Sequence, residues 1–465
     1  MKSWLELQVN KNPEKIFIQN NNRPYTYMDT AINVRSFANG MYRLGIRKTD
    51  RVLIDIPSSI ELIELILSCF ELGAIAIPIS QKITDKDRKD MIDITKPKII
   101  LTNWNKKKMF FKAKIHVQFI EELSNSSSGC GIIDFNYKRN NNDICSIIFT
   151  SGSTSIPKPV QLTYENFEAS CNSWNDFLNF KRNDQFLCCL PLSHIGGLAV
   201  IIRSLIFSFS VNLVNSFETE VIFKTMKKFP ITIISLVPTM LKRIIDKKDG
   251  LEALKNIDHI LLGGGPVSKK ILQICIKEGL SIKKVYGMTE TCSGIIGLDL
   301  IDEPNKISFA GRPLKNVAIW IEKNEIIISG PMVMKGYFNQ RDAESVHNSH
   351  DIGWIDDDGF LFLEMRRKDM IISGGENINP KEIEDALYTI SNFDDIAIFG
   401  KEDEEWGQKI IALIVPKNNK QKSINLKEHL HAKVAKHKIP KEFIFVDKIH
   451  RNEIGKLIYE KLNIS

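Results

Sequence analysis

A short run of small hydroxyl residues is the part of this chain whose residue types and spacing most clearly indicate chemistry. Residues 147–160 read IIFTSGSTSIPKPV, so an apolar strand opens into six small residues and then into Pro157 and Lys158. Small side chains let backbone N–H groups approach phosphate oxygens, hydroxyls add donors, and the ammonium neutralises charge. The run is not a Walker loop, which needs GxxxxGK[ST] and a helix straight after it. It predicts a phosphate-binding loop, and a Ser/Gly linker is the plainer alternative.

Two later segments carry groups that suit the rest of a nucleotide. Residues 286–290 read YGMTE and combine an aromatic ring, a hydroxyl and a carboxylate. A hard cation such as Mg²⁺ prefers carboxylate and phosphate oxygens together, which gives the glutamate a reason to lie beside phosphate. Asp351 offers two acceptor oxygens, which suit the vicinal hydroxyls of a ribose. The alternatives without a functional role are a plain turn at residues 286–290 and a structural ion pair of Asp351 or Arg366.

In their order along the chain, these segments resemble the motifs of the adenylate-forming superfamily, which includes acyl-CoA synthetases, luciferases and the adenylation domains of peptide synthetases. The phosphate loop of that family reads T-S-G-[ST]-T-G-x-P-K, and its YGxTE motif matches residues 286–290. Asp351 aligns with the aspartate of the family's TGD motif, and Arg366 aligns with the arginine of GRxxD. The chain departs from glycine in these patterns at Ser155, His350 and Met365.

The resemblance implies a set of ATP-binding residues. In the family, the tyrosine of YGxTE stacks on adenine, the threonine meets the α-phosphate and the glutamate helps to hold Mg²⁺. The aspartate of TGD and the arginine of GRxxD contact the ribose. Carried to this chain, the set is Thr150, Ser151, Gly152, Ser153, Thr154, Lys158, Gly263, Gly264, Gly265, Pro266, Tyr286, Gly287, Thr289, Glu290, Asp351 and Arg366.

The C-terminal part of the chain has the features of a separate domain that carries a catalytic lysine. A charged break at residues 366–369 predicts a boundary between a domain of residues 1–367 and one of residues 368–465. Residues 450–456, HRNEIGK, are similar to the family segment PRNxxGK, whose lysine offsets charge while one anion attacks another. The resemblance implies this role for Lys456, a hinge at Lys368, and room for the pantetheine arm of CoA at Gly374 and Gly375.

A histidine and an arginine are the candidates for contact with an acyl substrate. His194 lies in LPLSHIGG, which resembles the acyl-binding segment LPLFHxxG of the family; a structural histidine is the alternative. This region and the segment RRKDMIISGGENINPKEIE are most similar to ligases that join 2-succinylbenzoate to CoA in menaquinone biosynthesis. That acid keeps one carboxylate free, so a cation is expected near it, and Arg203 is the candidate.

The resemblance implies an AMP-forming acid–thiol ligase that uses ATP and Mg²⁺, with CoA as cosubstrate. The acid attacks the α-phosphate of ATP, and CoA then displaces AMP from the acyl-adenylate. No side-chain nucleophile is needed, so catalysis depends on positioning and charge stabilisation. Three alternatives remain open: a ligase for another aryl or acyl acid, a free-standing adenylation enzyme that loads a carrier protein, and a nucleotide-binding regulator without catalysis.

The composition of the chain indicates which kinds of partner it is expected to bind. The 63 basic and 56 acidic residues are well mixed, so the net charge of +7 does not indicate a nucleic-acid surface. No secretory signal opens the chain, and the longest apolar stretch, residues 198–214, contains Arg203 and is too short for a membrane helix. The eight cysteines lack CxxC spacing, which predicts reduced, buried thiols. We therefore expect a cytoplasmic monomer or homodimer that binds small molecules, without nucleic acid or membrane insertion.

Apolar runs in the first 300 residues alternate between strand and helix lengths, which predicts an α/β fold. Such alternation produces parallel-rich sheets flanked by helices. A β-barrel-like part and a small, mobile α+β C-terminal domain are expected after it, and Asn379 and Pro380 predict a capped helix start. The predicted strands include residues 51–57, 74–78, 98–102, 185–190, 211–214, 231–236 and 259–262, and the predicted helices include residues 28–44, 59–72, 164–178, 198–208 and 218–229.

Overall fold

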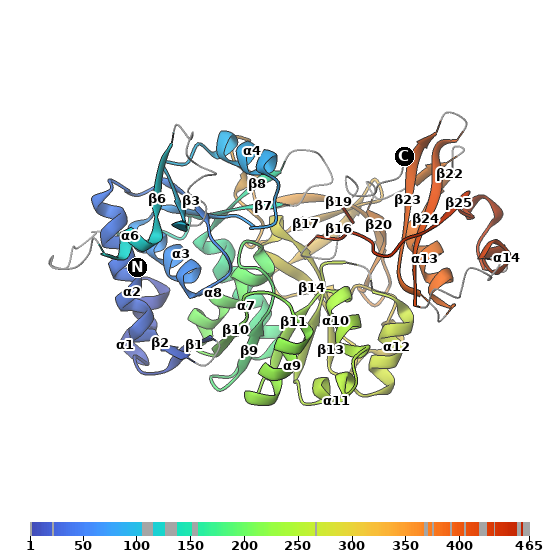
Figure 1. The fold of residues 1–465 in the computed structure, drawn as a ribbon, viewed down its shortest axis with the longest axis horizontal. Helices are drawn as coiled ribbons and strands as arrows, with labels where there is room; N and C mark the ends of the chain where they lie inside the picture. Colours follow the sequence, from blue (N-terminus) through green and yellow to red (C-terminus); the bar gives the residue numbers. More distant parts are fainter. Residues whose placement is uncertain are drawn as a thin grey trace.

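The computed structural model describes most of the chain, and it forms four β-sheets with helices packed on them (Figure 1). All structural statements concern residues 2–20, 23–104, 115–125, 137–150, 157–265, 267–366, 371–373, 376–390, 393–403, 406–417, 426–431, 433–452 and 457–458.

The first large sheet has seven strands and a parallel centre, with antiparallel strands at one side. In spatial order its strands are β18 (Gly336–Tyr337), β8 (Lys158–Thr163), β7 (Ile144–Thr150), β4 (Ile75–Pro78), β3 (Arg51–Asp55), β5 (Ile99–Thr102) and β6 (His116–Phe119). In the sequence, β7 precedes the predicted phosphate loop and β8 follows it. Lys158, at the exit of that loop, is therefore the first residue of a strand.

The second large sheet has nine strands and is also parallel at its centre. In spatial order they are β15 (Arg312–Pro313), β14 (Ser293–Asp299), β13 (Ile282–Met288), β12 (His259–Leu262), β11 (Ile233–Leu236), β9 (Gln185–Cys188), β10 (Ser210–Leu213), β1 (Ile16–Asn20) and β2 (Arg23–Thr26). The parallel-rich sheets predicted from the sequence are confirmed.

The four longest helices that contribute to the core between the two large sheets are labelled in Figure 1. They are α2 (Tyr27–Arg43), α3 (Ile60–Leu72), α7 (Tyr164–Leu178) and α8 (Ile195–Phe207). Their fully buried residues, such as Leu65 and Phe167, belong to one hydrophobic cluster with Val52 of β3 and Val211 of β10. Burying the apolar faces of both sheets on shared helices fixes one sheet relative to the other.

Local sequence signals set the ends of these helices. Helix α3 begins after Ser59, whose hydroxyl accepts the Leu62 N–H at 3.3 Å, and ends at Gly73 with φ +65°. Both are standard cap residues, because serine satisfies a free N–H and glycine adopts the left-handed conformation without strain. The predicted start of α8 at Leu198 was wrong: the helix begins at Ile195, and His194 is its N-cap.

The remaining helices of this part are shorter. They are α1 (Trp4–Lys11), α4 (Asp85–Thr95), α6 (Ile120–Asn125), α9 (Thr219–Lys228), α10 (Pro238–Ile245), α11 (Gly250–Lys255) and α12 (Lys269–Lys277). No described helix is both long and apolar enough to cross a membrane. The seven cysteines in the described residues are buried and free, as predicted.

The β-rich part after residue 312 is a four-stranded antiparallel sheet. In order its strands are β16 (Ala318–Glu322), β17 (Glu325–Ser329), β19 (Val346–Ile355) and β20 (Leu361–Arg366). Strand β19 carries Asp351, and its partner β20 carries the backbone of Arg366. This sheet therefore brings two of the predicted ribose-binding positions side by side.

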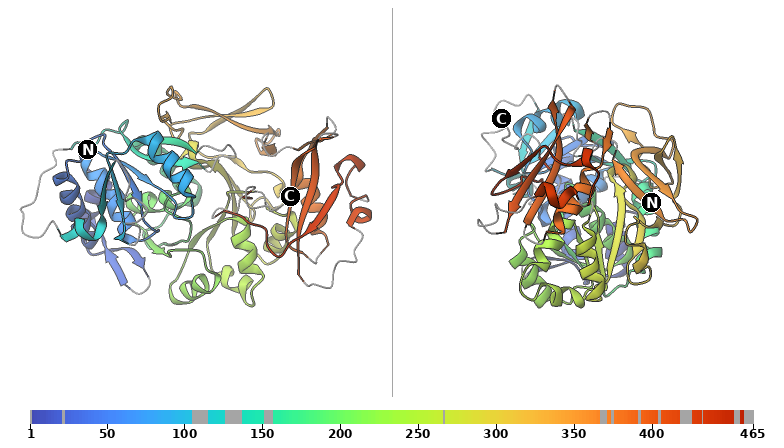
Figure 2. Two further views of the ribbon diagram at one scale, coloured as in Figure 1. Left: turned by 45° about the horizontal axis from the view of Figure 1, so that its top comes forward. Right: turned by 90° about the vertical axis from the view of Figure 1, so that its right-hand side faces the viewer.

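The C-terminal part has its own sheet and hydrophobic core, and it lies at one end of the molecule (Figures 1 and 2). Its elements are β21 (Ile371–Ser373), β22 (Glu376–Ile378), α13 (Pro380–Tyr388), β23 (Phe393–Asp403), β24 (Gly407–Pro416), α14 (Leu426–His431) and β25 (Glu442–Phe445). Asn379 caps α13 through the Lys381 N–H at 2.8 Å, which confirms the predicted helix start. The amide of Asn379 also donates to the Glu364 carbonyl at 3.1 Å, which links this part to β20.

Candidate active site

The YGMTE segment begins at the carboxyl end of strand β13 in the second large sheet. Tyr286 ends the regular register of β13 with β14, and Thr289–Thr291 form a 3₁₀ turn directly after the strand. A Cβ at Gly287 would lie 2.1 Å from the Ser293 carbonyl oxygen, so only glycine allows β13 and β14 to approach this closely. Packing alone therefore requires glycine at position 287, independently of any ligand.

The structure brings Tyr286 and Asp351 into contact, although they belong to different sheets. The Tyr286 hydroxyl donates to Asp351 Oδ2 at 2.8 Å, and both side chains are buried. Asp351 pairs with Arg366 across β19 and β20, so the two residues predicted to bind ribose are cross-strand neighbours. The site therefore clusters an aromatic ring, a carboxylate and the backbone position of an arginine.

His350 occupies the position at which the TGD motif has glycine, and its backbone conformation shows why. Its φ is +56°, in the left-handed region that glycine adopts without strain. The His350 N–H donates to Asn348 Oδ1 at 2.8 Å, and its ring lies 3.3 Å from Glu325 Oε2. The Asp351 N–H donates to Ser349 Oγ at 3.1 Å. These contacts hold the turn that presents Asp351 even though glycine is absent.

Glu290, the predicted Mg²⁺ ligand, lies beside Tyr337 and Lys158. Its Oε1 accepts a hydrogen bond of 2.8 Å from the Tyr337 hydroxyl. Lys158 Nζ lies 5.4 Å from the centre of the Tyr337 ring. His347 is half-buried, and its pKa lies below the ordinary value, mainly because of burial. The charge of Lys158 lowers this pKa further, whereas the charge of Glu290 acts in the opposite direction. Lys158 and Glu290, which are predicted to bind ATP and its cation, thus lie on either side of the same tyrosine.

The residues around Glu290 fit a cation that arrives with a nucleotide. No cluster of three or more histidine, cysteine, aspartate or glutamate side chains occurs in the described part of the chain, so a metal cage built from protein alone is not seen there. Mg²⁺ is usually held by one or two carboxylates together with substrate phosphates and water. A single carboxylate near the exit of a phosphate loop has this character. When bound, Mg²⁺ would neutralise charge on the phosphates.

The glycines after β12 have separate structural roles. A Cβ at Gly263 would meet Val285 Cγ2 at 2.6 Å, so this glycine permits close contact with β13. Gly264 has φ +81°, which turns the chain away from the sheet. Gly265 has more room, since its nearest contact, Pro238 Cγ, would be 4.0 Å from an added Cβ. The turn thus leaves the carboxyl end of the parallel sheet, where ligands bind in α/β folds.

Helix α8 separates the two residues predicted to contact the acid. His194 precedes the helix and Arg203 lies within its last part. At 1.5 Å per residue, the nine-residue spacing places them about 13 Å apart along the helix axis. The two side chains therefore do not converge on one carboxyl group. His194 is half-buried, and its carbonyl accepts the N–H groups of Gly197 and Leu198, which begins α8.

Arg203 is a buried cation that has no acidic partner among the described residues. It is 3 % exposed, and its guanidinium stacks 4.4 Å from the centre of the Trp174 ring. Its Nη2 donates to Ser293 Oγ at 2.7 Å, whereas its Nε is buried without a hydrogen-bond partner in the described structure. Burial lowers the pKa of Arg203 to about 10. Burying a guanidinium without a carboxylate is unfavourable in free energy. An anion bound beside Arg203 would therefore be strongly stabilised.

Several predicted site residues lie outside the described part of the chain: Ser151, Gly152, Ser153, Thr154, Pro266, Lys368, Gly374, Gly375 and Lys456. Thr150 ends β7 and pairs with Lys158 at the start of β8, so the two ends of the predicted phosphate loop meet. Arg366 is described by its backbone alone. The roles predicted for all these residues stay predictions.

Sequence reasoning did not identify four residues that complete the site. Ser293 and Trp174 hold Arg203, while Tyr337 and His347 face Glu290. One local signal was present, because Ser293 follows directly on the YGMTE segment and lies in a strained backbone conformation with φ +99°. The others are distant in sequence and meet the site only through the packing of separate sheets.

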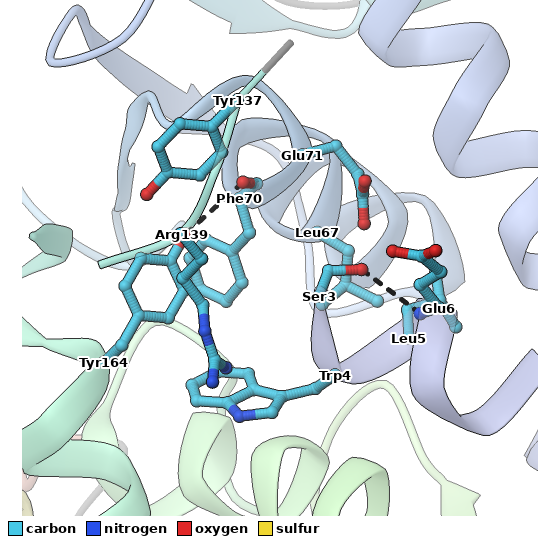
Figure 3. Close-up of a pocket in the computed structure, with 10 residues that line it drawn as sticks. All are labelled: Ser3, Trp4, Leu5, Glu6, Leu67, Phe70, Glu71, Tyr137, Arg139 and Tyr164. Carbon is cyan, nitrogen blue, oxygen red and sulfur yellow. Dashed lines mark hydrogen bonds between the residues drawn. The ribbon is translucent and has the colours of Figure 1, made fainter. Parts of the chain in front are cut away.

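A cavity of about 60 Å³ lies elsewhere, between α1, α3 and α7 (Figure 3). Arg139 crosses it and pairs with Glu168 at 2.7 Å, while its guanidinium lies 5.0 Å from the ring centre of Trp4. None of the residues predicted for the active site lines this cavity. It is a gap in the packing of the N-terminal helices.

The fold combines two large α/β sheets with a smaller C-terminal unit, and the side chains clustered at their edges are those predicted to bind a nucleotide. The model of the AMP-binding enzyme family matches residues 5–338, and that of the AMP-binding enzyme C-terminal domain matches residues 382–456. The chain therefore belongs to the family of AMP-binding enzymes.

Comparison with curated relatives and solved structures shows which members of this family the chain resembles. The chain is 32% identical to a 2-succinylbenzoate–CoA ligase of Oceanobacillus iheyensis over 99% of this chain and 98% of the relative. It is 30% identical, over the same shares, to a 2-succinylbenzoate–CoA ligase of Bacillus cereus. The o-succinylbenzoate CoA synthetase of Bacillus subtilis with its acyl-adenylate intermediate superposes with a TM-score of 0.91 at 29% identity, covering 100% of this chain and 98% of that one. The same enzyme with ATP and magnesium ion gives 0.88, covering 99% and 98%.

Proposed function

We propose that this protein ligates 2-succinylbenzoate to CoA at the expense of ATP, through an acyl-adenylate, as the sequence analysis predicted. AMP and pyrophosphate are the other products, and menaquinone biosynthesis is the pathway expected. The names of the relatives and the ligands of the solved structures support this reaction. Within the chain itself, buried Arg203 is the observation that carries the choice of acid.

Arg203 matches the chemistry of an acid with two carboxylates. One carboxylate of 2-succinylbenzoate is activated, and the other stays charged through both steps. Arg203 offers a guanidinium that is fully buried, held by Ser293 and Trp174, and lacks an acidic partner in the described structure. A charge-assisted hydrogen bond to the free carboxylate would satisfy this group. A ligase for a simple monocarboxylic acid would have no use for a buried cation.

The residues of this chain supply positioning and charge stabilisation in both steps. A carboxylate oxygen of the acid forms a bond to the α-phosphorus of ATP, and the bond to the bridging oxygen breaks as pyrophosphate leaves with the electron pair. Lys456 is assigned to offset the charge of this attack. Tyr286 and Asp351 are assigned to adenosine, and Glu290 to the Mg²⁺ that accompanies the phosphates. The CoA thiolate then forms a bond to the acyl carbon, and the carbon–oxygen bond to AMP breaks.

The domain arrangement is part of the proposal. Residues 1–367 bind ATP and acid, residues 368–465 form a cap that carries Lys456, and rotation about Lys368 alternates the two half-reactions. Lys456→Ala should abolish formation of acyl-adenylate but leave the reaction of preformed acyl-adenylate with CoA unchanged. Loss of both half-reactions in a folded variant would contradict the alternation. We further propose a cytoplasmic enzyme that acts as a monomer or homodimer.

Pyrophosphate release over a panel of carboxylic acids tests the reaction directly. We expect 2-succinylbenzoate to give the highest kcat/KM, with CoA as acceptor and no loading of a carrier protein. The panel should include benzoate and 4-phenylbutyrate, each of which lacks one of the two carboxylates. A higher kcat/KM for a monocarboxylic acid would exclude the proposed substrate, and ATP binding without acid-dependent pyrophosphate would exclude an enzyme.

A further inference from the structure

Tyr337 lies between two groups of opposite charge. Its hydroxyl donates to Glu290 Oε1 at 2.8 Å, and its ring centre lies 5.4 Å from Lys158 Nζ. No ion pair joins Lys158 to Glu290 within 4.0 Å in the described structure, although both side chains contact the same phenol ring system. The tyrosine therefore stands where a direct lysine–glutamate ion pair would otherwise be favourable.

The backbone fixes the position of this tyrosine from both sides. Tyr337 pairs with Val160 of β8, two residues beyond Lys158, and the Phe338 N–H donates to the Pro159 carbonyl at 2.9 Å. On the other side, the Met334 N–H donates to the Glu290 carbonyl at 2.8 Å. The segment that carries Tyr337 is thus tied both to the exit of the phosphate loop and to the turn after β13. Its placement does not depend on a bound nucleotide.

Both contacts of Tyr337 affect groups that ATP and its cation need. The hydroxyl occupies Oε1 of Glu290 and orients the carboxylate, which leaves Oε2 available to a cation. The ring attracts the lysine ammonium through a cation–π interaction and keeps it close to the loop. If Lys158 and Glu290 paired with each other, each would be partly neutralised, and Mg²⁺ and phosphate would have to break that pair before binding.

We propose that Tyr337 is a positioning residue, which orients the Glu290 carboxylate toward Mg²⁺ and holds Lys158 apart from it for the phosphates. This inference rests on the proposed function, because that function places ATP and Mg²⁺ at Glu290. Tyr337 itself takes no part in bond making or breaking. Its effect is on the binding of the metal–nucleotide complex.

Two substitutions separate the roles of the hydroxyl and the ring. Tyr337→Phe removes the hydrogen bond to Glu290 but keeps the ring under Lys158. Tyr337→Leu removes both contacts and lets Lys158 reach Glu290. Tyr25→Phe is the matched control, because Tyr25 is also half-buried and carries a cation, Arg23, 4.8 Å from its ring centre, far from the active site in the fold.

Binding is measured by titration calorimetry with ATP alone, and by electron paramagnetic resonance of Mn²⁺ bound in the presence of ATP. For Tyr337→Phe we expect about tenfold weaker binding of Mn²⁺ at unchanged affinity for metal-free ATP, which is the scale for losing a group that orients a metal ligand. For Tyr337→Leu we expect both affinities to fall. Tyr25→Phe should match the wild type in both.

Equal Mn²⁺ affinity in Tyr337→Phe and the wild type would overturn the proposal, and so would equal weakening of Mn²⁺ and metal-free ATP, which a merely structural role would give. Circular dichroism and the midpoint of thermal unfolding identify a variant that has lost its fold. Acid-dependent pyrophosphate release by the wild type is measured in the same series. If the wild type fails that assay, the proposed function fails, whereas a normal wild type with an unaffected Tyr337→Phe removes only the role of Tyr337.

Discussion

The hydroxyl of Tyr286 donates a hydrogen bond of 2.8 Å to Oδ2 of Asp351, across 65 positions of sequence. Tyr286 lies in β13 of the nine-stranded sheet, and Asp351 lies in the four-stranded sheet. The contact therefore joins the part of the site assigned to adenine with the part assigned to ribose. It also fixes the orientation of a buried carboxylate before any nucleotide binds.

Tyr286→Phe should weaken ATP binding through Asp351 while the ring remains available to stack on adenine. A neutral–charged hydrogen bond contributes about 1–2 kcal/mol, which corresponds to a rise in the KM for ATP of about 5- to 30-fold. The KM for the acid should stay within about twofold, because the lost hydrogen bond lies in the part of the site assigned to the nucleotide. Steady-state kinetics with each substrate varied in turn measures both. A rise in the KM for the acid alone would show that the bond serves another purpose.

Arg203→Leu should impair the acid site without destabilising the protein. Losing a charge-assisted bond to the free carboxylate costs about 2–3 kcal/mol, so the KM for 2-succinylbenzoate should rise about 30- to 150-fold, with the KM for ATP unchanged. Because the buried guanidinium contacts Ser293 and Trp174 but no acidic partner in the described structure, leucine should leave the free energy of unfolding equal or higher.

Arg203→Lys serves as the companion variant, since it keeps the charge but loses the planar group that stacks on Trp174. We expect it to recover part of the affinity for the acid. If Arg203→Leu raised the KM values of acid and ATP equally, the assignment of Arg203 to the free carboxylate would be wrong.

Glu64 gives the protein a defined pH dependence of stability that is unrelated to the active site. It is 3 % exposed, and burial raises its pKa from the ordinary value of 4.5 to about 7, although the Asn33 amide donates to it at 2.7 Å. The folded state thus holds this proton more tightly than the unfolded state. Its contribution to stability is greatest below pH 4.5 and is lost as the pH rises to about 7.

Glu64→Gln removes that ionisation and keeps the shape of the side chain. We expect the free energy of unfolding of the variant to exceed that of the wild type by about 1–3 kcal/mol at pH 8, and the difference to shrink toward pH 5. Urea unfolding at several pH values measures it. A difference that is the same at pH 5 and pH 8 would show that Glu64 is not the titrating group.

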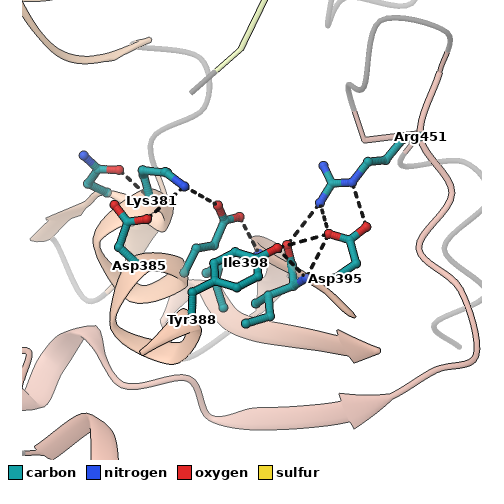
Figure 4. Close-up of polar contacts among 9 residues, drawn as sticks. Lys381, Asp385, Tyr388, Asp395, Ile398 and Arg451 are labelled. Atoms are coloured by element: carbon teal, nitrogen blue, oxygen red, sulfur yellow. Dashed lines mark hydrogen bonds and ion pairs between the residues drawn. The ribbon is translucent and has the colours of Figure 1, made fainter. Parts of the chain in front are cut away.

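Arg451 forms an ion pair with Asp395 of β23, which links the C-terminal segment of the chain to this strand (Figure 4). Its Nε and Nη2 each lie 2.9 Å from an oxygen of Asp395, and Nη2 also donates to the Ile396 carbonyl at 3.0 Å. Bidentate pairs of this kind are the stronger ion pairs. Asp395→Asn should lower the free energy of unfolding of the C-terminal part by about 1–2 kcal/mol, measured by hydrogen exchange of β23.

The matched control for that pair is Glu344→Gln. Glu344 lies 2.7 Å from Arg341, but both side chains are strongly exposed, at 69% and 86%. Such pairs contribute little, because water already solvates both charges. Equal effects of the two substitutions would show that the bidentate geometry of Arg451 and Asp395 adds nothing to stability.

The sequence predicted those elements whose signals are local. Gly73 ends α3 and Asn379 caps α13, as the sequence predicted, and α3 begins one residue after the predicted start at Ser59, which is its N-cap. Helix α4, with the sequence DKDRKDMIDIT, was not predicted, because it is largely polar and has few buried residues. The start of α8 was misplaced because Gly196 and Gly197 weaken a helix on propensity, whereas here tertiary packing against Leu190 and Pro191 favours it.

By itself, the sequence determined the alternation of strands and helices, the positions of the motifs and their order along the chain, because these depend on residue type and short spacing. Only the tertiary structure decided that Tyr286 meets Asp351, that Tyr337 meets Glu290, and that Arg203 is buried without an acidic partner in the described structure. These relationships join residues of different sheets or of helices packed between them. They arise from how apolar faces are buried together, and no local pattern of residues specifies that.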